Sequence, residues 1–308
     1  MTDSLLCIDG ENMPPRPKRF IQDTIALIYD FDGTLSPQPM QEYTVLPKIG
    51  IDPADFWGEV NRQSHELGEE PMLTYMRLLI EKAESKGLHI GRKEFKALGK
   101  NVQFFNGVSD WFKRVDAYVA KHGNRQIKVR HYIISAGLKE ILEGVSINKH
   151  FANVFASEYH YNHHDVATFP KLLITDTTKT QFLFRINKGK ESLTESINQH
   201  MPQEDRPIPF ENMIYIGDGE TDVPSMALTR QNGGNSIAVY KPGRTEREKK
   251  TLVTCKKLLQ AGRVNFIAPA DYVKDSELER RVQLLLKSVI AKIEYEKELF
   301  DCRKKHAI

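Results

Sequence analysis

An apolar run that ends in two carboxylates constrains the fold of this chain more than any other feature. Residues 25–29 read Ile-Ala-Leu-Ile-Tyr, and Asp30 and Asp32 follow, ahead of Gly33 and Thr34. The run is short, rich in β-branched and aromatic residues and ends abruptly, which is typical of a buried strand in a parallel sheet. Ligands of open α/β sheets bind beyond the carboxyl ends of the strands. The two acids are therefore predicted to lie at a ligand site.

Two carboxylates at a dry strand end cost free energy unless something neutralises them. A hard divalent cation such as Mg²⁺ would do so, because it prefers several oxygen ligands. The alternative is a solvated loop after the strand, since Asp-Gly is also a common turn dipeptide. This stretch favours a ligand site over a solvated turn, but it does not exclude the turn.

Composition places the chain among ordinary globular proteins. It has 308 residues, 40% of them hydrophobic and 28% charged, which allows one large domain or two unequal ones. The net charge of +3 gives no support for nucleic-acid binding. No apolar run approaches the ~20 residues that span a bilayer, and the acidic N-terminus lacks a signal-peptide layout. Cys7, Cys255 and Cys302 are odd in number and far apart, which favours reduced thiols and a cytoplasmic location.

The order of predicted elements indicates a doubly wound, mainly parallel α/β sheet with an inserted domain. Residues 40–100 show helical spacing and no strand pattern, with helix starts at Asp52-Pro53 and at Pro71. Proline-rich residues 36–39 precede this stretch, and a second hinge follows it at residues 104–108. We therefore expect a helical cap domain at 39–103, inserted into a core domain formed by 1–38 and 104–308.

Three later stretches carry further expectations. Residues 167–173 and 181–186 read as a hairpin, and 187–190 as the approach to a helix through Leu193 and Ile197. A final helix is expected over 276–300. Its apolar stripe either docks on the core or forms a homodimer contact, and docking is the general rule for one such stripe.

Polar residues follow other predicted strands as well. Ser135 ends the strand at 127–134, and Asp218 and Asp222 follow the strand at 213–216. Lys188 stands at a predicted helix start. Because parallel strands end on one edge, these residues should meet Asp30 and Asp32 there.

This constellation suits phosphoryl transfer through a covalent aspartyl-phosphate. A carboxylate such as Asp30 can act as nucleophile, and Asp32 can act as general acid and then base. The developing phosphoryl charge needs a cation and fixed donors. Ser135 and Lys188 can supply donors, and Asp30 and Asp218 can hold Mg²⁺.

The motifs resemble those of the haloacid dehalogenase (HAD) superfamily, in the branch that includes phosphoserine phosphatase. The family's DxDGT motif matches Asp30-Phe-Asp32-Gly-Thr34, and its apolar strand ending in Ser or Thr matches Ile133-Ile-Ser135. Its GDGxxD motif matches residues 217–222. The third motif is a lone lysine, for which we choose Lys188 on its place before a helix; the alternatives are Lys171, Lys179 and Lys190.

The resemblance implies a role for each matched residue. Asp30 would be the nucleophile and a Mg²⁺ ligand, and Asp32 the acid/base, with its backbone carbonyl on the metal. Asp218 would be a metal ligand, and Asp222 would orient the metal site through water or through Lys188. Ser135 and Lys188 would bind the phosphoryl group. The presence of Asp32 favours phosphate-ester hydrolysis over dehalogenation, because a leaving oxygen needs a proton.

The expected activity is hydrolysis of a small phosphorylated metabolite. A phosphotransferase or mutase with the same intermediate is the alternative, and so is a non-catalytic HAD scaffold, which would be expected to have lost motif acids. Phosphoserine phosphatases grip their amino acid with a Glu after the first motif and an Arg in the cap; Glu42 and Arg77 are candidates without a convincing motif match. The histidines at 160, 163 and 164 are interpreted as a polar loop rather than a second metal site, because their spacing fits no usual zinc pattern.

Overall fold

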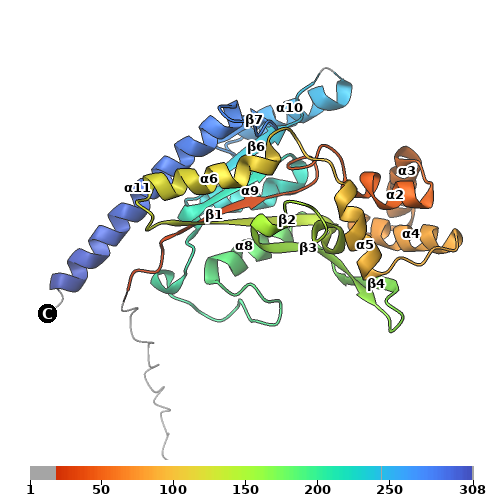
Figure 1. Cartoon of the computed structure of the whole chain (residues 1–308), viewed down its shortest axis with the longest axis horizontal. Coiled ribbons are helices and arrows are strands. Elements are labelled where there is room, and N and C mark those ends of the chain that lie inside the picture. Colours follow the sequence, from red (N-terminus) through yellow and green to blue (C-terminus); the bar gives the residue numbers. More distant parts are fainter. Residues whose placement is uncertain (1–18, 244, 307–308) are drawn as a thin grey trace, which may run out of the picture.

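The computed structural model describes residues 19–243 and 245–306, and within them one seven-stranded sheet forms the centre of the molecule (Figure 1). The strand order is β4-β3-β2-β1-β5-β6-β7, with all neighbours parallel except the antiparallel pair β3–β4. The predicted doubly wound α/β class is therefore confirmed. The strands are β1 (Thr24–Tyr29), β2 (Lys128–Leu138), β3 (Phe151–Tyr161), β4 (Ala167–Leu172), β5 (Met213–Gly217), β6 (Asn235–Tyr240) and β7 (Phe266–Pro269).

Helices cover both faces of the sheet, and β1 supplies side chains to each side. Ile25, Leu27 and Tyr29 pack on the face that carries α6 (Val108–His122) and α11 (Glu277–His306). Ala26 and Ile28 pack on the opposite face. That face carries α8 (Lys179–Lys188), α9 (Val223–Gln231) and α10 (Glu246–Gln260). A strand buried on both faces must be apolar throughout, which explains its uninterrupted sequence.

The chain between β1 and α6 is helical, as expected, and lies at one end of the sheet (Figure 1). The Asp52 carboxylate accepts a hydrogen bond from Ala54 N at 2.8 Å and caps α3, whose first residue is proline. Glu70 caps α4 in the same way through Leu73 N. The helices are α1 (Met40–Tyr43), α2 (Val45–Ile49), α3 (Pro53–Leu67), α4 (Pro71–Ser85) and α5 (Arg92–Leu98).

The β3–β4 hairpin (residues 151–172) attaches this helical segment to the sheet. Gly91 forms an antiparallel bridge with Val166, and Ala167 N donates to Ile90 O at 3.3 Å. Glu158 on β3 forms ion pairs with three basic side chains: Arg92 at 3.3 Å, Lys139 at 4.0 Å and Lys171 at 3.0 Å.

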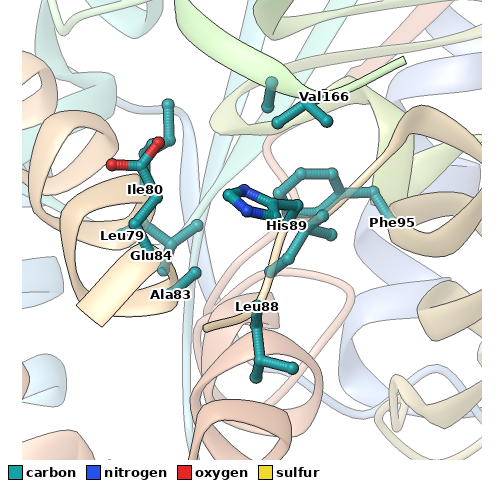
Figure 2. A pocket seen from close by; sticks show the side chains of 10 residues that line it. Leu79, Ile80, Ala83, Glu84, Leu88, His89, Phe95 and Val166 are labelled. Carbon is teal, nitrogen blue, oxygen red and sulfur yellow. The ribbon is translucent and has the colours of Figure 1, made fainter. Parts of the chain in front are cut away.

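Apolar side chains fill the seam between α4 and the tip of this hairpin. In Figure 2, Leu79, Ile80 and Ala83 from α4 face Phe95 and Val166 across it. The cavity left between them is about 10 Å³, which is no more than the room of one water molecule. The seam is therefore a packing contact rather than a ligand site.

The predicted hairpin of 167–173 with 181–186 is wrong. β4 pairs with β3, and residues 181–186 belong to α8. Phe182, Leu183 and Ile186 are buried at helical spacing, a pattern too short to distinguish from a strand without its neighbours. Residues 187–190 end this helix at Gly189 (φ +63°) instead of starting one, and no helix forms through Leu193 and Ile197.

The last helix runs longer than predicted, over Glu277–His306, and its stripe docks on the core as expected. Leu278, Val282 and Leu286 are fully buried, in the cluster that also holds α6. Homodimerisation stays a prediction. None of the helices in the described ranges combines the length and apolar character that crossing a bilayer requires. Cys7 lies outside the described residues, and Cys255 and Cys302 are free thiols.

The remaining short elements are α7 (Lys139–Leu142) and five 3-10 helices. These are η1 (Gly99–Asn101), η2 (Asn148–His150), η3 (Gln203–Asp205), η4 (Phe210–Asn212) and η5 (Glu220–Asp222). The turn at η5 matters most for function, because it carries Asp222 back toward the end of β5.

Candidate active site

A buried lysine joins two acids at the carboxyl edge of the sheet. Lys179 Nζ lies 2.9 Å from Asp30 Oδ1 and 2.7 Å from Asp222 Oδ1, and all three side chains are buried. Asp30 follows β1, Asp222 ends η5, and Lys179 is the first residue of α8. Three distant segments of the chain therefore meet in one ion-pair network.

This network corrects the predicted lysine. Lys188 Nζ donates to Ile197 O at 2.6 Å and Gln199 O at 2.9 Å, away from the acids. The two lysines are the first and last residues of α8, and nine residues span about 13 Å of helix axis. Lys188 is therefore at the wrong end of the helix to reach Asp30, and Lys179, one of the alternatives, takes that place.

Asp218 lies on the same side of the sheet as Asp30. One carboxylate oxygen from each of Asp30, Asp218 and Asp222 lies within 4.8 Å of the other two. Asp222 is held by further bonds, because Tyr215 Oη donates to its Oδ1 at 2.7 Å and Asp218 N donates to its Oδ2 at 3.2 Å. The structure thus brings together the acids that follow the two neighbouring strands β1 and β5.

Two glycines let these acids approach the backbone. A Cβ on Gly33, whose φ is +81°, would stand 2.0 Å from Asp218 Oδ2. A Cβ on Gly217 would stand 2.2 Å from Asp222 Oδ2. Neither distance is sterically possible, so both positions require glycine for the acids to keep their places.

Asp32 lies beside this cluster and faces the segment that starts α1. Its Oδ1 accepts a hydrogen bond from Met40 N at 2.8 Å. Burial, together with the nearby charge of Asp30, raises the pKa of the Asp32 carboxyl well above its usual range. A carboxyl with a raised pKa can hold a proton near neutral pH, as a general acid must.

Ser135 lies on β2, the strand that neighbours β1. Tyr29 is paired with Ile133, so Ser135 stands just beyond the end of β1 and close in register to Asp30. Its Oγ accepts a hydrogen bond from Gly137 N at 3.0 Å, which leaves the hydroxyl proton available for donation. The strand was predicted to stop at Ser135 and instead continues to Leu138, with a shift of register against β3.

The charges of the site are unbalanced. Burial raises the pKa of Asp30 to about 6, against the opposing effect of Lys179. Burial and the neighbouring charges of Asp30 and Asp222 raise the pKa of Asp218 well above its usual range. For Lys179, the charges of Asp222 and Asp30 overcome burial, and its pKa is raised. When Asp30, Asp218 and Asp222 are all ionised, one ammonium leaves excess negative charge, which a hard cation bound by carboxylate oxygens would neutralise.

Sequence reasoning missed Tyr215 and Lys241. The sequence pattern identifies Tyr215 only as part of a buried strand, although a buried tyrosine hydroxyl needs a partner and here donates to Asp222. Lys241 follows β6 and lines a cavity of about 140 Å³ that Asp32 and Asp218 also line. No local pattern marks Lys241, because its position depends on where β6 ends relative to β5.

The other candidates have partners outside the carboxylate cluster, although Glu42 lies near enough to Asp32 for its charge to contribute to the raised pKa of that carboxyl. Glu42 accepts a hydrogen bond from Trp57 Nε1 at 2.9 Å. Arg77 pairs with Glu69 and Glu81 and donates to Gln63 on α3 at 2.8 Å. His160 stacks on Phe169, and the next two histidines are exposed.

Comparison with known proteins agrees with this geometry. The family model of haloacid dehalogenase-like hydrolases matches residues 27–227. An uncharacterized protein of Borreliella burgdorferi is 27% identical over 281 residues, which cover 83% of this chain and 94% of that protein.

Among solved structures, a phospho-aspartyl intermediate analogue of phosphoserine phosphatase has a TM-score of 0.51 at 14% identity, over 85% of this chain and 99% of that one. A HAD family hydrolase from Salmonella enterica has a TM-score of 0.50 at 16% identity, over 73% of this chain. The match spans 64% of the length of the Salmonella protein. At these identities the structures establish a shared fold.

Proposed function

Since the chain belongs to the haloacid dehalogenase-like hydrolase family, we propose that it is a Mg²⁺-dependent phosphomonoesterase acting on a small phosphorylated metabolite. One observation carries this proposal. The buried Lys179 ammonium lies within hydrogen-bond distance of both Asp30 and Asp222, and Asp218 completes a group of carboxylates at the same strand ends.

Asp30 is the nucleophile in this proposal. Its carboxylate attacks phosphorus, the bond from phosphorus to the ester oxygen breaks, and an aspartyl-phosphate forms. Lys179 favours the ionised form of Asp30 and fixes its orientation through the 2.9 Å contact. Ser135 Oγ donates its free proton to a phosphoryl oxygen, where negative charge develops.

Asp32 moves the protons. Its carboxyl, protonated because burial raises its pKa, gives a proton to the departing alkoxide. The resulting carboxylate then takes a proton from the water that attacks phosphorus. The bond between phosphorus and Asp30 breaks, which frees inorganic phosphate and regenerates the Asp30 carboxylate. One side chain thus serves as acid in the first step and as base in the second.

The donor set suits Mg²⁺, because hard carboxylate oxygens come from two adjacent strand ends. Asp30 and Asp218 would hold the ion, with the Asp32 carbonyl beside them. When bound, Mg²⁺ supplies positive charge to the phosphoryl oxygens. Asp222 is bonded to Lys179 and Tyr215, so it positions the lysine rather than offering a free ligand oxygen.

The test is hydrolysis of p-nitrophenyl phosphate with Mg²⁺ and with EDTA. Asp30→Asn should lower kcat by at least about 10³-fold, because the amide is a poor nucleophile. Asp176→Asn is the matched control, since Asp176 is exposed in the turn before α8. Asp30→Asn retaining most of its activity, or full activity in EDTA, would contradict the proposal. Transfer of the phosphoryl group to an added alcohol, without release of inorganic phosphate, would indicate a phosphotransferase instead. A wild-type protein with no activity would indicate a non-catalytic scaffold.

A further inference from the structure

The site is closed on the side of the β3–β4 hairpin. Tyr159 Oη donates to Met76 O at 2.8 Å, and Tyr75 Oη donates to Ala136 O at 3.0 Å, so α4 is bonded to β3 and to the end of β2. The bridge between Gly91 and Val166 closes the seam further out. A substrate therefore has little room to reach Asp30 from this direction.

The open approach lies on the other side of Asp32. The cavity of about 140 Å³ has Asp32 and Asp218 in its lining, together with residues 37–39 from the segment after β1. Residues after β6 and on α10 complete it: Lys241, Glu248 and Thr251. A space of this size has room for a leaving group of a few heavy atoms.

Lys241 is the basic side chain in this lining, and the local structure holds it there. Glu248 Oε2 accepts a hydrogen bond from Thr245 N at 2.9 Å, in the capping box that starts α10. Lys241 Nζ lies 4.0 Å from Glu248 Oε1, at the limit of an ion pair, and 36% of its side chain is exposed. An ammonium has three N–H donors, and so long a contact leaves donors for a ligand.

We propose that Lys241 is a specificity-determining residue, which binds a second anionic group, such as a carboxylate, on the leaving group. The inference rests on the proposed function, because the leaving oxygen must lie beside Asp32 to receive its proton. The rest of the leaving group then extends into the cavity toward Lys241. Asp218 and Glu248 would repel an anion there, as would Asp32 once it has given up its proton, and the ammonium offsets that repulsion.

The experiment compares two substrates that share a three-carbon skeleton. 3-Phosphoglycerate carries a carboxylate where glycerol 3-phosphate carries a hydroxymethyl group. The wild-type enzyme should prefer 3-phosphoglycerate in kcat/KM. Lys241→Gln should reduce that preference by about tenfold, mainly through KM, because a charge-assisted hydrogen bond is lost. Lys241→Arg should restore much of it.

Lys256→Gln is the control, because it removes the same charge from an exposed position on α10 outside the cavity. It should leave the preference at the wild-type value. Equal kcat/KM for the two substrates in the wild-type enzyme, or equal losses for both in Lys241→Gln, would overturn the inference. Hydrolysis of p-nitrophenyl phosphate distinguishes the role of Lys241 from the proposed phosphatase activity. If either of these outcomes is found while p-nitrophenyl phosphate is still hydrolysed, the role of Lys241 is refuted and the phosphatase activity is not.

Discussion

Replacing Lys179 by methionine removes the ammonium that joins Asp30 and Asp222. Two charge-assisted hydrogen bonds, of 2.9 and 2.7 Å, are lost from a side chain that is 1% exposed. Each is worth about 1.5–3 kcal/mol, and breaking a buried ion pair typically costs about 3–5 kcal/mol. We therefore expect the free energy of unfolding to fall by about 3–5 kcal/mol near pH 8.

The loss should depend on pH. Burial already raises the pKa of Asp30 to about 6 with Lys179 beside it, and without the ammonium we expect this pKa to rise further above its unfolded value. Deprotonating Asp30 in the folded state then costs more folding energy than in the wild-type protein, and this extra cost is present at high pH and disappears as pH falls below the raised pKa. The difference in stability between Lys179→Met and the wild-type protein should therefore be smaller at pH 5 than at pH 8.

The assay is thermal or urea unfolding at both pH values, with phosphatase activity measured on p-nitrophenyl phosphate. Activity of Lys179→Met should fall by at least about 10²–10³-fold, since the lysine orients the nucleophile. Lys188→Met is the matched control, because that ammonium bonds only to backbone carbonyls of the loop after α8 among the described residues. If Lys188→Met lost activity and Lys179→Met did not, the assignment of the lysine would be refuted.

Two further substitutions test the close approach of Asp218 to Gly33 and the ion pairs of Glu158. Gly33→Ala should weaken Mg²⁺ activation by roughly 10–100-fold, because its Cβ would displace Asp218. Gly68 also has a positive φ (+66°) but faces open space, so Gly68→Ala should lower stability without changing Mg²⁺ activation. Equal Mg²⁺ activation in the two variants would contradict this steric account. Burial would raise the pKa of Glu158, but its three basic neighbours hold it below its usual 4.5. The stabilisation of the folded state by ionised Glu158 is therefore present above pH 4.5 and lost as pH falls through the lower folded-state pKa. Glu158→Gln should lower the free energy of unfolding by about 1 kcal/mol at pH 7 and by almost nothing at pH 3. Thermal unfolding at both pH values measures this, and equal losses would exclude the electrostatic explanation.

Local sequence was sufficient for β1, for the helices that begin at Pro53 and Pro71, and for the acids that follow β1 and β5. Each has a short-range physical cause: a strand buried on both faces must be apolar, and a helix start needs a cap. The segment 181–186 had no such cause, because its six residues contain too few apolar positions to separate a helix from a strand.

Burial fixes the composition of a strand and chain direction fixes which end carries the acids, so carboxylates at the ends of buried parallel strands can be predicted from local sequence alone. Which lysine reaches these carboxylates depends on packing across the fold, because α8 packs on the sheet with its first residue at the carboxyl edge, and nothing near Lys179 in sequence encodes that placement. The same holds for Tyr215 and Lys241: a side chain's partner across the fold depends on packing between segments that local spacing does not specify.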